Sequence, residues 1–355
     1  MVSVIGFDIG GANTKAAFIT TKNGFLEKLQ VDSVYFPIWK NPEKLEKILK
    51  KLTRRLTRSK RLDLVAVTMT AELSDAYRTK REGVNRILIQ IENVFPANRT
   101  LILDVDAKLG SVQEARAKPI KVAAANWAAT GWMISQLKRD CVAIDVGSTT
   151  TSIIPILNGV NAAEAKTDLE KLTNGELIYT GTLRTNVAAT VHKIPLRGGT
   201  AQVSSEFFAQ SADIHLILGH ISEKEYTVET ADGKEINRQD SLARLARVVC
   251  ADVEMLSEQE IVAMAQYVYE MQVEQIATGL RRVRGRIDKR GRKIAAVVTG
   301  LGRNFLARKA ALNVGFAEIV DFGELVGGDV ARVSTAFAVA LMGASHLERR
   351  SICWL

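Results

Sequence analysis

Two copies of one short pattern constrain the fold of this chain more than any other feature of its sequence. In each copy an apolar strand carries an aspartate, a glycine turn and hydroxyl side chains follow, and the chain leaves through a second apolar strand. The copies centre on Asp8 and Asp145. This pattern is typical of a β-hairpin with a bare backbone at its tip. Two such hairpins far apart in one chain predict two similar half-molecules that face each other across a cleft.

Each predicted hairpin suits a phosphorylated ligand. Glycines let backbone N–H groups approach a phosphate closely, and Lys15 adds a compact positive charge. The aspartates repel phosphate, but they can hold a divalent cation that in turn binds it. A single hairpin of this kind is equally compatible with an ordinary tight turn, so the repetition is what favours a binding site. The predicted phosphate-binding residues are Gly10, Gly11, Asn13, Thr14, Lys15, Gly147, Ser148, Thr149 and Thr150.

Polar residues also follow a third predicted strand. Residues 62–69 read as a buried strand, and Thr68, Thr70, Glu72 and Asp75 lie at its end or just beyond. Because the carboxyl ends of strands face the ligand crevice in open α/β sheets, these residues are site candidates. The alternative is a helix N-terminus that Thr70 caps, with Glu72 in its first turn.

A pair of acids ends the strand predicted from residue 100 to residue 105. Asp104 and Asp106 are two residues apart, so on a strand their carboxylates would share one face and serve a metal or a proton transfer. A turn is the alternative. The candidate ligands for Mg²⁺ are therefore Asp8, Asp104, Asp106 and Asp145.

Two further stretches carry binding candidates. The strand predicted at 294–299 leads through Gly300 and Gly302 into a helix, which presents backbone N–H groups to an anion or a nucleotide. Residues 161–225 mix charged residues and glycines at irregular intervals, and this texture predicts an inserted segment that builds a pocket for a second substrate. The candidate substrate-binding residues inside and outside this segment are Arg81, Asn126, Asp168, Glu176 and Arg184.

The composition is that of a globular protein. Of 355 residues, 47% are hydrophobic, and because no apolar run has membrane-spanning length we expect no membrane partner. Three cysteines without metal-like spacing, and no signal peptide, favour the cytoplasm. The net charge of +9 resides largely in residues 44–61 and 281–293. The first of these lacks the interleaved aromatic residues of base-stacking surfaces, so we expect no nucleic-acid partner.

The predicted organisation has two halves. The first half is expected to span residues 1–137, and the second 138–345, with an inserted substrate segment at about 161–290. Residues 346–355 are expected to form a tail. Helices are predicted at 44–61, 84–94, 122–137, 240–252, 258–284 and 331–344.

This order of elements resembles the actin-like ATPase superfamily, which includes sugar kinases and the Hsp70 ATPase domain. The resemblance implies an α/β fold with duplicated ribonuclease H-like domains around a central cleft. It also implies that the two hairpins cradle phosphates, that acids on them hold Mg²⁺, and that Gly300 and Gly302 lie beside the adenosine of a nucleotide.

Six strings of the sequence carry a more specific resemblance: residues 8–15, 68–75, 123–127, 145–151, 175–181 and 244–252. Together they resemble hydantoinase/oxoprolinase-like proteins of a tetrahydromethanopterin-linked one-carbon pathway. Ser152 departs from this pattern, because these relatives usually have an aspartate there. The metal contact is therefore expected from Asp8, Asp145 and the pair Asp104 and Asp106.

The enzymatic representative of that group is a synthase of methanofuran biosynthesis. The resemblance therefore implies a transferase that joins the phenol of γ-glutamyltyramine to an aminomethyl-furanylmethyl diphosphate and releases diphosphate. Mg²⁺ would help the diphosphate leave, and Glu72, Asp75 or Asp104 would take the phenol proton. The implied catalytic residues are Asp8, Lys15, Glu72, Asp75, Asp104 and Asp145.

Other functions stay open at this point. A small-molecule kinase, or a hydantoinase/oxoprolinase-like enzyme that uses ATP and releases ADP, would employ the same phosphate cradle. A non-enzymatic scaffold of the superfamily would bind partners through long insertions, and the sequence has no repeat or low-complexity tail to support it. The expected partners are small-molecule substrates, with a homo-oligomer as a further possibility.

Overall fold

The computed structural model describes residues 1–58, 60–288 and 293–355. Ser59 and residues 289–292, which belong to the two basic stretches, lie outside the described residues. The chain divides into two compact units, each discontinuous in sequence. Unit 1 comprises residues 1–143, 154–171 and 322–355, and unit 2 comprises residues 144–153 and 172–321.

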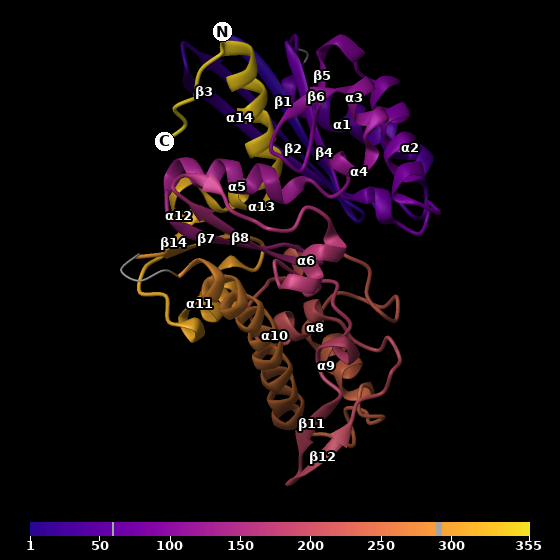
Figure 1. Cartoon of the computed structure of the whole chain (residues 1–355). Coiled ribbons are helices and arrows are strands. Elements are labelled where there is room, and N and C mark those ends of the chain that lie inside the picture. The colour runs from indigo at the N-terminus through magenta and orange to yellow at the C-terminus, as the bar shows by residue number, and fades with distance from the viewer. Residues whose placement is uncertain (59, 289–292) are drawn as a thin grey trace. The chain divides into compact units, whose positions relative to one another are not determined.

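Unit 1 is built on one six-stranded sheet. Its strands are β1 (Val2–Ile9), β2 (Asn13–Lys22), β3 (Phe25–Tyr35), β4 (Leu64–Met69), β5 (Thr100–Leu103) and β6 (Leu109–Ser111). They lie in the order β3-β2-β1-β4-β5-β6 (Figure 1). The first three strands form an antiparallel meander, while β4 is parallel to β1 and β5 is parallel to β4. The first predicted hairpin is therefore the centre of this sheet.

Helices cover both faces of the unit 1 sheet. They are α1 (Leu45–Thr57), α2 (Lys80–Glu92), α3 (Val112–Ala117), α4 (Pro119–Val122), α5 (Asn126–Leu137), α12 (Phe322–Val326), α13 (Gly328–Arg332) and α14 (Ser334–Glu348). Successive side chains of a strand point to opposite faces. On β1, Ile5 and Phe7 accordingly share a core with α1 and α2, whereas Gly6 meets α14. This alternation places Asp8 on the α14 face.

The C-terminal residues belong to unit 1, although the sequence suggested that they close the second half. The alanine-rich α14 lies against β1, where Gly6 has no side chain to obstruct the backbone of Ala336 and Ala340. The last residues are not a free tail either. The N–H of Cys353 donates to Gly24 O over 2.7 Å, and the N–H of Leu26 donates to Cys353 O over 2.9 Å.

Unit 2 repeats the same strand order. The strands of the second half are β7 (Cys141–Val146), β8 (Thr151–Leu157), β9 (Val160–Asn161), β10 (Leu177–Ile178), β11 (Lys193–Leu196), β12 (Gly199–Gln202), β13 (Ala295–Gly300) and β14 (Ile319–Asp321). The main sheet has the order β10-β8-β7-β13-β14, in which β7 and β8 contribute residues to both units. A hairpin followed by two parallel strands thus occurs in both sheets, and this confirms the predicted α/β class with duplicated ribonuclease H-like domains.

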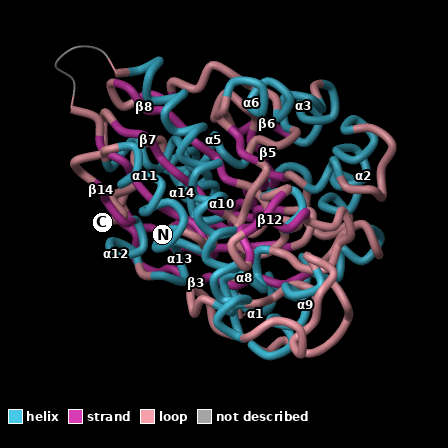
Figure 2. The backbone as a smooth tube through the Cα atoms, turned by 90° about the horizontal axis from the view of Figure 1, so that it is seen from below, coloured by secondary structure: helices cyan, strands magenta, loops and turns pink. Residues whose placement is uncertain are grey.

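In the second half of the chain, helices alternate with long loops (Figure 2). The helices are α6 (Asp168–Asn174), α7 (Val187–Thr190), α8 (Ser211–Ile217), α9 (Arg238–Arg247), α10 (Glu258–Ile287) and α11 (Arg308–Val314). The longest, α10, starts at a capping box between Ser257 and Glu260. It packs against α8, α9 and α11.

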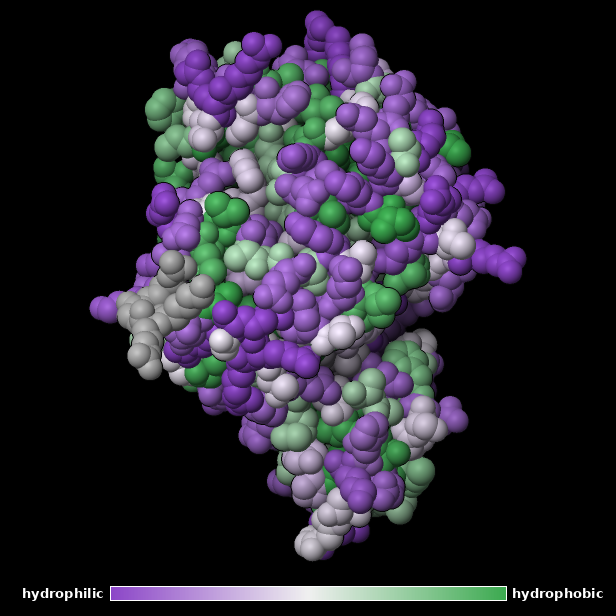
Figure 3. All heavy atoms as spheres, viewed as in Figure 1, coloured by the Kyte–Doolittle hydropathy of each residue, from purple (hydrophilic) through white to green (hydrophobic). Residues whose placement is uncertain are grey.

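The exposed surface is mostly hydrophilic, with hydrophobic side chains scattered among polar ones on the face shown in Figure 3. Within the described residues, no helix combines the length and the apolar character needed to cross a membrane.

Candidate functional site

The turn of hairpin 1, which joins β1 to β2, presents bare backbone. The N–H of Gly10 donates to Asn13 O over 2.9 Å and closes the turn. Two more hydrogen bonds hold the turn to the segment after β3, from Phe36 N to Ala12 O and from Ile38 N to Gly11 O. A Cβ on Gly11 would meet nothing within 4 Å, so the space above this backbone is open. The turn therefore has the rigidity and the access that a phosphate site needs.

Three polar side chains form a row beside this turn. In the sheet register Asp8 lies opposite Lys15 on one side and Thr68 on the other, so all three share one face. Asp8 is 5% exposed, and its Oδ1 has no hydrogen-bond partner. Lys15 Nζ lies 3.9 Å from the other carboxylate oxygen. The Thr68 hydroxyl is also buried without a partner.

The environment of Asp8 suits a cation. Burial raises the pKa of its carboxyl above the usual range, and the charge of Lys15 opposes this rise. An unsatisfied buried acceptor costs about 1–3 kcal/mol, more when it is charged. Carboxylate oxygens are the ligands that Mg²⁺ prefers, and Mg²⁺ usually takes only one or two of them beside phosphates and water. Among the described residues, no group of three or more His, Cys, Asp or Glu side chains could hold a metal.

A second buried carboxylate lies at the end of β4. Glu72 belongs to the 3₁₀ turn Ala71–Leu73, is 1% exposed, and neither of its carboxylate oxygens has a hydrogen-bond partner. Lys80 Nζ lies 3.8 Å from Glu72 Oε1 and 2.8 Å from Asp168 Oδ2. Burial raises the pKa of Glu72 to about 7, and the positive charge of Lys80 is the main effect that opposes this rise. Thr70 is the N-cap residue of this 3₁₀ turn and Glu72 lies in its first turn, as the alternative predicted, but the Thr70 side chain accepts no capping hydrogen bond.

Other predicted site residues of unit 1 are more ordinary. Asp75 is exposed, and so is Arg81 in the first turn of α2. Asn126 Oδ1 accepts a hydrogen bond from the N–H of Trp127 at the start of α5. Asp168 is held by Lys80. The structure therefore brings Asp168 to Glu72, but it gives Asp75 no feature of a catalytic acid.

Asp104 and Asp106 do not form the predicted carboxylate pair on a strand. β5 ends at Leu103, and Asp104 Oδ1 accepts hydrogen bonds from the N–H groups of Asp106 and Lys108, each over 2.9 Å. Asp106 instead forms ion pairs with Lys121 and Lys166. An aspartate that accepts from its own following backbone favours a turn over a strand, so the alternative of a turn was correct.

Hairpin 2, which joins β7 to β8, repeats the turn of hairpin 1. The N–H of Gly147 donates to Thr150 O over 2.9 Å, in the same relation as Gly10 to Asn13. Residues 181–184 pack against this turn. The N–H groups of Leu183 and Arg184 both donate to Ser148 O. Asp145 is half-buried in β7, as its counterpart in β1 is buried, so both acids lie beside their glycine turns.

The segment that packs behind hairpin 2, residues 181–184, begins with a glycine for a steric reason. A Cβ on Gly181 would lie 2.5 Å from the carbonyl carbon of Thr149, so no larger residue fits between the segment and the turn. The N–H of Thr182 donates to Gly147 O over 2.9 Å. Arg184 Nη1 donates to Thr149 Oγ1 over 3.3 Å, which places this predicted substrate-binding cation beside the phosphate turn.

Gly300 and Gly302 pack against hairpin 2. Gly300 has φ +87°, and a Cβ there would lie 2.5 Å from Asp145 Oδ1. A Cβ on Gly302 would lie 2.6 Å from both Thr182 Oγ1 and Val146 Cγ1. The N–H of Gly302 donates to Val146 O, as the N–H of Thr70 donates to Ile9 O in the other half. These glycines therefore permit close packing around Asp145.

The structure contains a row of hydrogen-bonded polar side chains that was not predicted from the sequence. Gln272 is 1% exposed on α10, and its Nε2 donates to Gly181 O over 2.7 Å, directly behind hairpin 2. Its Oε1 lies 3.0 Å from His215 Nε2, and His215 Nδ1 lies 3.2 Å from His220 Nδ1. The signal was present in the sequence, because Gln272 interrupts the apolar stripe of α10 between Val268 and Ile276.

Glu176 is a structural residue in this arrangement. It is fully buried, and its Oε1 accepts a hydrogen bond from Arg286 Nη2 over 2.8 Å.

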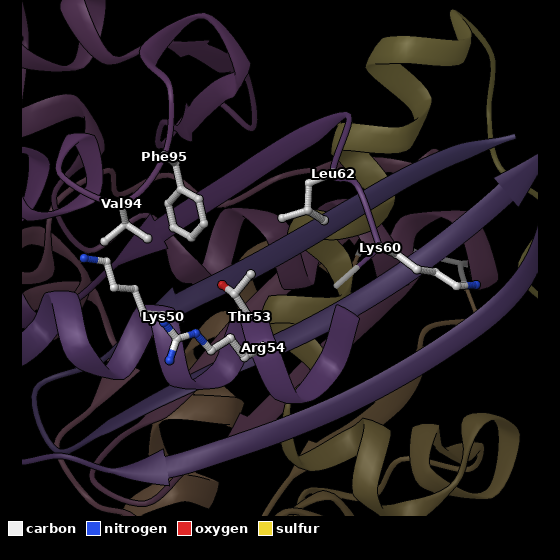
Figure 4. Close-up of a pocket in the computed structure, with 7 residues that line it drawn as sticks. All are labelled: Lys50, Thr53, Arg54, Lys60, Leu62, Val94 and Phe95. Carbon is white, nitrogen blue, oxygen red and sulfur yellow. The ribbon is translucent and has the colours of Figure 1, made fainter. Parts of the chain in front are cut away.

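Unit 1 has a pocket of about 320 Å³ away from these residues. It lies between α1, the segment that precedes β4 and the segment that follows α2 (Figure 4). Its lining includes Leu62, which precedes β4, so this pocket lies at the opposite end of that strand from Thr70.

The fold and the paired hairpins define the class of protein: an α/β protein with two ribonuclease H-like units, as in the actin-like ATPases and sugar kinases. Among solved structures, the nucleotide-free form of acetone carboxylase has a similar fold. It aligns with a TM-score of 0.55 at 10% identity over 96% of this chain and 70% of that chain.

The chain belongs to the hydantoinase/oxoprolinase family, whose profile matches residues 63–341. A relative in Methanocaldococcus jannaschii is 39% identical over 349 residues, which cover 98% of this chain and 99% of the relative. That relative is a (4-{4-[2-(gamma-L-glutamylamino)ethyl]phenoxymethyl}furan-2-yl)methanamine synthase. A relative of the same name in Methanococcus vannielii is 36% identical over 216 residues, 60% of this chain and 95% of that protein.

Proposed function

We propose that this protein is the synthase that joins the phenol of γ-glutamyltyramine to (5-(aminomethyl)furan-3-yl)methyl diphosphate and releases diphosphate, in methanofuran biosynthesis. The observation that carries this proposal is the end-to-end match to the synthase of Methanocaldococcus jannaschii. The two glycine turns beside acids support it, because the reaction needs a site for diphosphate and a cation. The cytoplasm and small-molecule substrates follow from the same proposal.

The substrate chemistry sets what the protein must do. The furan ring delocalises positive charge from the attached methylene carbon, so the bond to diphosphate can break ahead of attack. Negative charge then builds on the leaving diphosphate. Backbone N–H groups that already point at this charge stabilise it without reorganisation. The N–H groups of Gly10 and Gly147 close their own turns, so we propose that the N–H groups of Gly11 and Ser148 stabilise the diphosphate and that Lys15 adds a positive charge.

In this proposal Asp8, beside hairpin 1, and Asp145, beside hairpin 2, are each candidate ligands for Mg²⁺, and a metal ion bound to diphosphate would neutralise the charge that develops on it. Asp8 fits this role because one of its oxygens is buried without a partner. The glutamyl group has one free carboxylate, which a guanidinium can hold with two hydrogen bonds. Arg184, which touches the turn of hairpin 2 through Thr149, or Arg81 is proposed to bind it.

The alternative is a small-molecule kinase or a hydantoinase/oxoprolinase-like enzyme that uses ATP. It predicts that Gly300 and Gly302 lie beside an adenosine. Both glycines pack against residues of hairpin 2, with Cβ positions within 2.6 Å of Asp145, Val146 or Thr182 atoms. Either reaction allows this packing, so an assay with and without ATP decides between them.

A paired assay tests the proposal. Purified protein with Mg²⁺ receives γ-glutamyltyramine and the furanylmethyl diphosphate without nucleotide, and in parallel γ-glutamyltyramine with ATP. We expect ether and diphosphate in the first reaction only. Asp8→Asn and Asp145→Asn should abolish them, whereas Glu27→Gln and Glu254→Gln, at exposed positions, serve as matched controls. Release of ADP or AMP without ether from the diphosphate would overturn the proposal.

A further inference from the structure

The reaction needs a group that takes the phenol proton, and three acids of unit 1 were candidates. Asp75 is exposed. Asp104 already accepts two backbone hydrogen bonds that shape its turn. Glu72 alone is buried with both carboxylate oxygens lacking a hydrogen-bond donor. A buried acceptor without a protein donor has the capacity that a substrate hydroxyl would fill.

The surroundings of Glu72 hold it at a defined place. It lies in the 3₁₀ turn that follows β4 directly, next to Thr70, whose N–H is bonded to Ile9 O at the end of β1. Glu72 and Asp8 are therefore carried by the carboxyl ends of neighbouring parallel strands. The carboxyl ends of strands are where ligands bind in open α/β sheets.

Two charged groups act on Glu72. Lys80, the first residue of α2, lies 3.8 Å from it and favours its ionised form. Asp168, in the first turn of α6, opposes that form, and it also binds Lys80 over 2.8 Å. The pKa of Glu72 is raised to about 7, chiefly because the side chain is buried. A group with such a pKa is poised for proton transfer near neutral pH.

We propose that Glu72 is the general base of the synthase reaction, and that Lys80 and Asp168 are positioning residues that set its proton affinity. This inference rests on the proposed function. The phenol O–H bond breaks and its proton goes to the Glu72 carboxylate. The phenol oxygen forms the ether bond to the furanylmethyl carbon, and the bond from that carbon to diphosphate breaks, with the electron pair leaving on diphosphate. No oxidant or further reactant is needed.

Glu72→Gln tests the base directly. The amide keeps the size of the side chain but cannot accept the proton, so we expect kcat to fall by about a hundredfold or more. The wild-type rate should fall as the pH drops through the pKa of Glu72, and this limb should vanish in the variant. A γ-glutamyltyramine with fluorine on its phenol ring, which is ionised more easily, should restore much of the lost rate. A purely structural residue would not respond to the acidity of the acceptor.

Two more variants shift the same limb in opposite directions. Lys80→Met removes a charge that lowers the pKa of Glu72, so the acidic limb should move to higher pH. Asp168→Asn removes a charge that raises it, so the limb should move to lower pH. These shifts remain measurable even if Glu72→Gln does not fold. Limbs that stay in place in both variants would overturn the assignment.

The outcomes separate this inference from the proposed function. If the wild-type protein forms no ether from the two substrates, the proposed function fails and the base assignment with it. If it forms ether, but Glu72→Gln keeps both the rate and the acidic limb of the Glu27→Gln control, only the assignment of Glu72 fails.

Discussion

The buried carboxyl of Glu72 predicts an unusual dependence of stability on pH. Its pKa rises from 4.5 to about 7 on folding, so the folded protein binds this proton more tightly than the unfolded chain. Stability from this group is therefore fully present below pH 4.5 and is lost as the pH rises to about 7. At 1.36 kcal/mol for each pKa unit, the loss amounts to about 3 kcal/mol. Glu72→Gln, which is neutral at every pH, should not suffer it.

The expected result is a crossing of two stability curves. At low pH the free energies of unfolding of the wild-type protein and the variant should be similar, and at about pH 8 the variant should be more stable by up to about 3 kcal/mol. Urea titrations followed by tryptophan fluorescence measure the unfolding of unit 1, which contains Glu72. All the tryptophans lie in this unit: Trp39, Trp127, Trp132 and Trp354. Parallel curves from about pH 5 to about pH 8 would refute the reasoning.

Three further changes have expected outcomes. Gly300→Ala should lower the free energy of unfolding, measured in thermal melts, by more than about 2 kcal/mol, because strain at positive φ adds to a clash with Asp145. The control Gly198→Ala, at φ +73° in open space, should cost only about 1 kcal/mol. Equal losses would contradict the packing account. Gln272→Met should destabilise by about 2 kcal/mol or more in chemical denaturation, because its buried partners lose their hydrogen bonds, and the exposed Gln266→Met should be neutral. Asp8→Asn should abolish ether formation without lowering stability, since burial already disfavours the charged carboxylate; a large loss of stability in denaturation curves would show that Asp8 is a structural residue.

The hairpins were predictable because their determinants are local. Two apolar strands and the glycine turn that joins them form a hairpin from about a dozen consecutive residues. The duplication of the pattern then indicated the duplicated fold. The assignment of residues 322–355 to unit 1 was out of reach, because it depends on the contact between α14 and Gly6 of β1, which are more than three hundred residues apart in the chain.

The candidate site was predictable by residue type but not by environment. The sequence does not rank Glu72, Asp75 and Asp104 as candidate bases. The structure distinguishes them, because the carboxylate of Glu72 is buried without a hydrogen-bond partner, Asp75 is exposed, and Asp104 accepts backbone hydrogen bonds in a turn. The sequence also shows the glycines at 300 and 302, but it does not distinguish a glycine that leaves room for a ligand from one that leaves room for a neighbouring strand. Their role follows from the closeness of Asp145 and Val146 atoms.

The central claim is that the phenol oxygen of γ-glutamyltyramine becomes the ether oxygen while diphosphate leaves, without a nucleotide. The most direct measurement is mass spectrometry of both products after reaction with an acceptor that carries heavy oxygen in its phenol group. We predict that the ether retains the whole label and that the diphosphate contains none. Label in the diphosphate, or no ether unless ATP is supplied, would contradict the account.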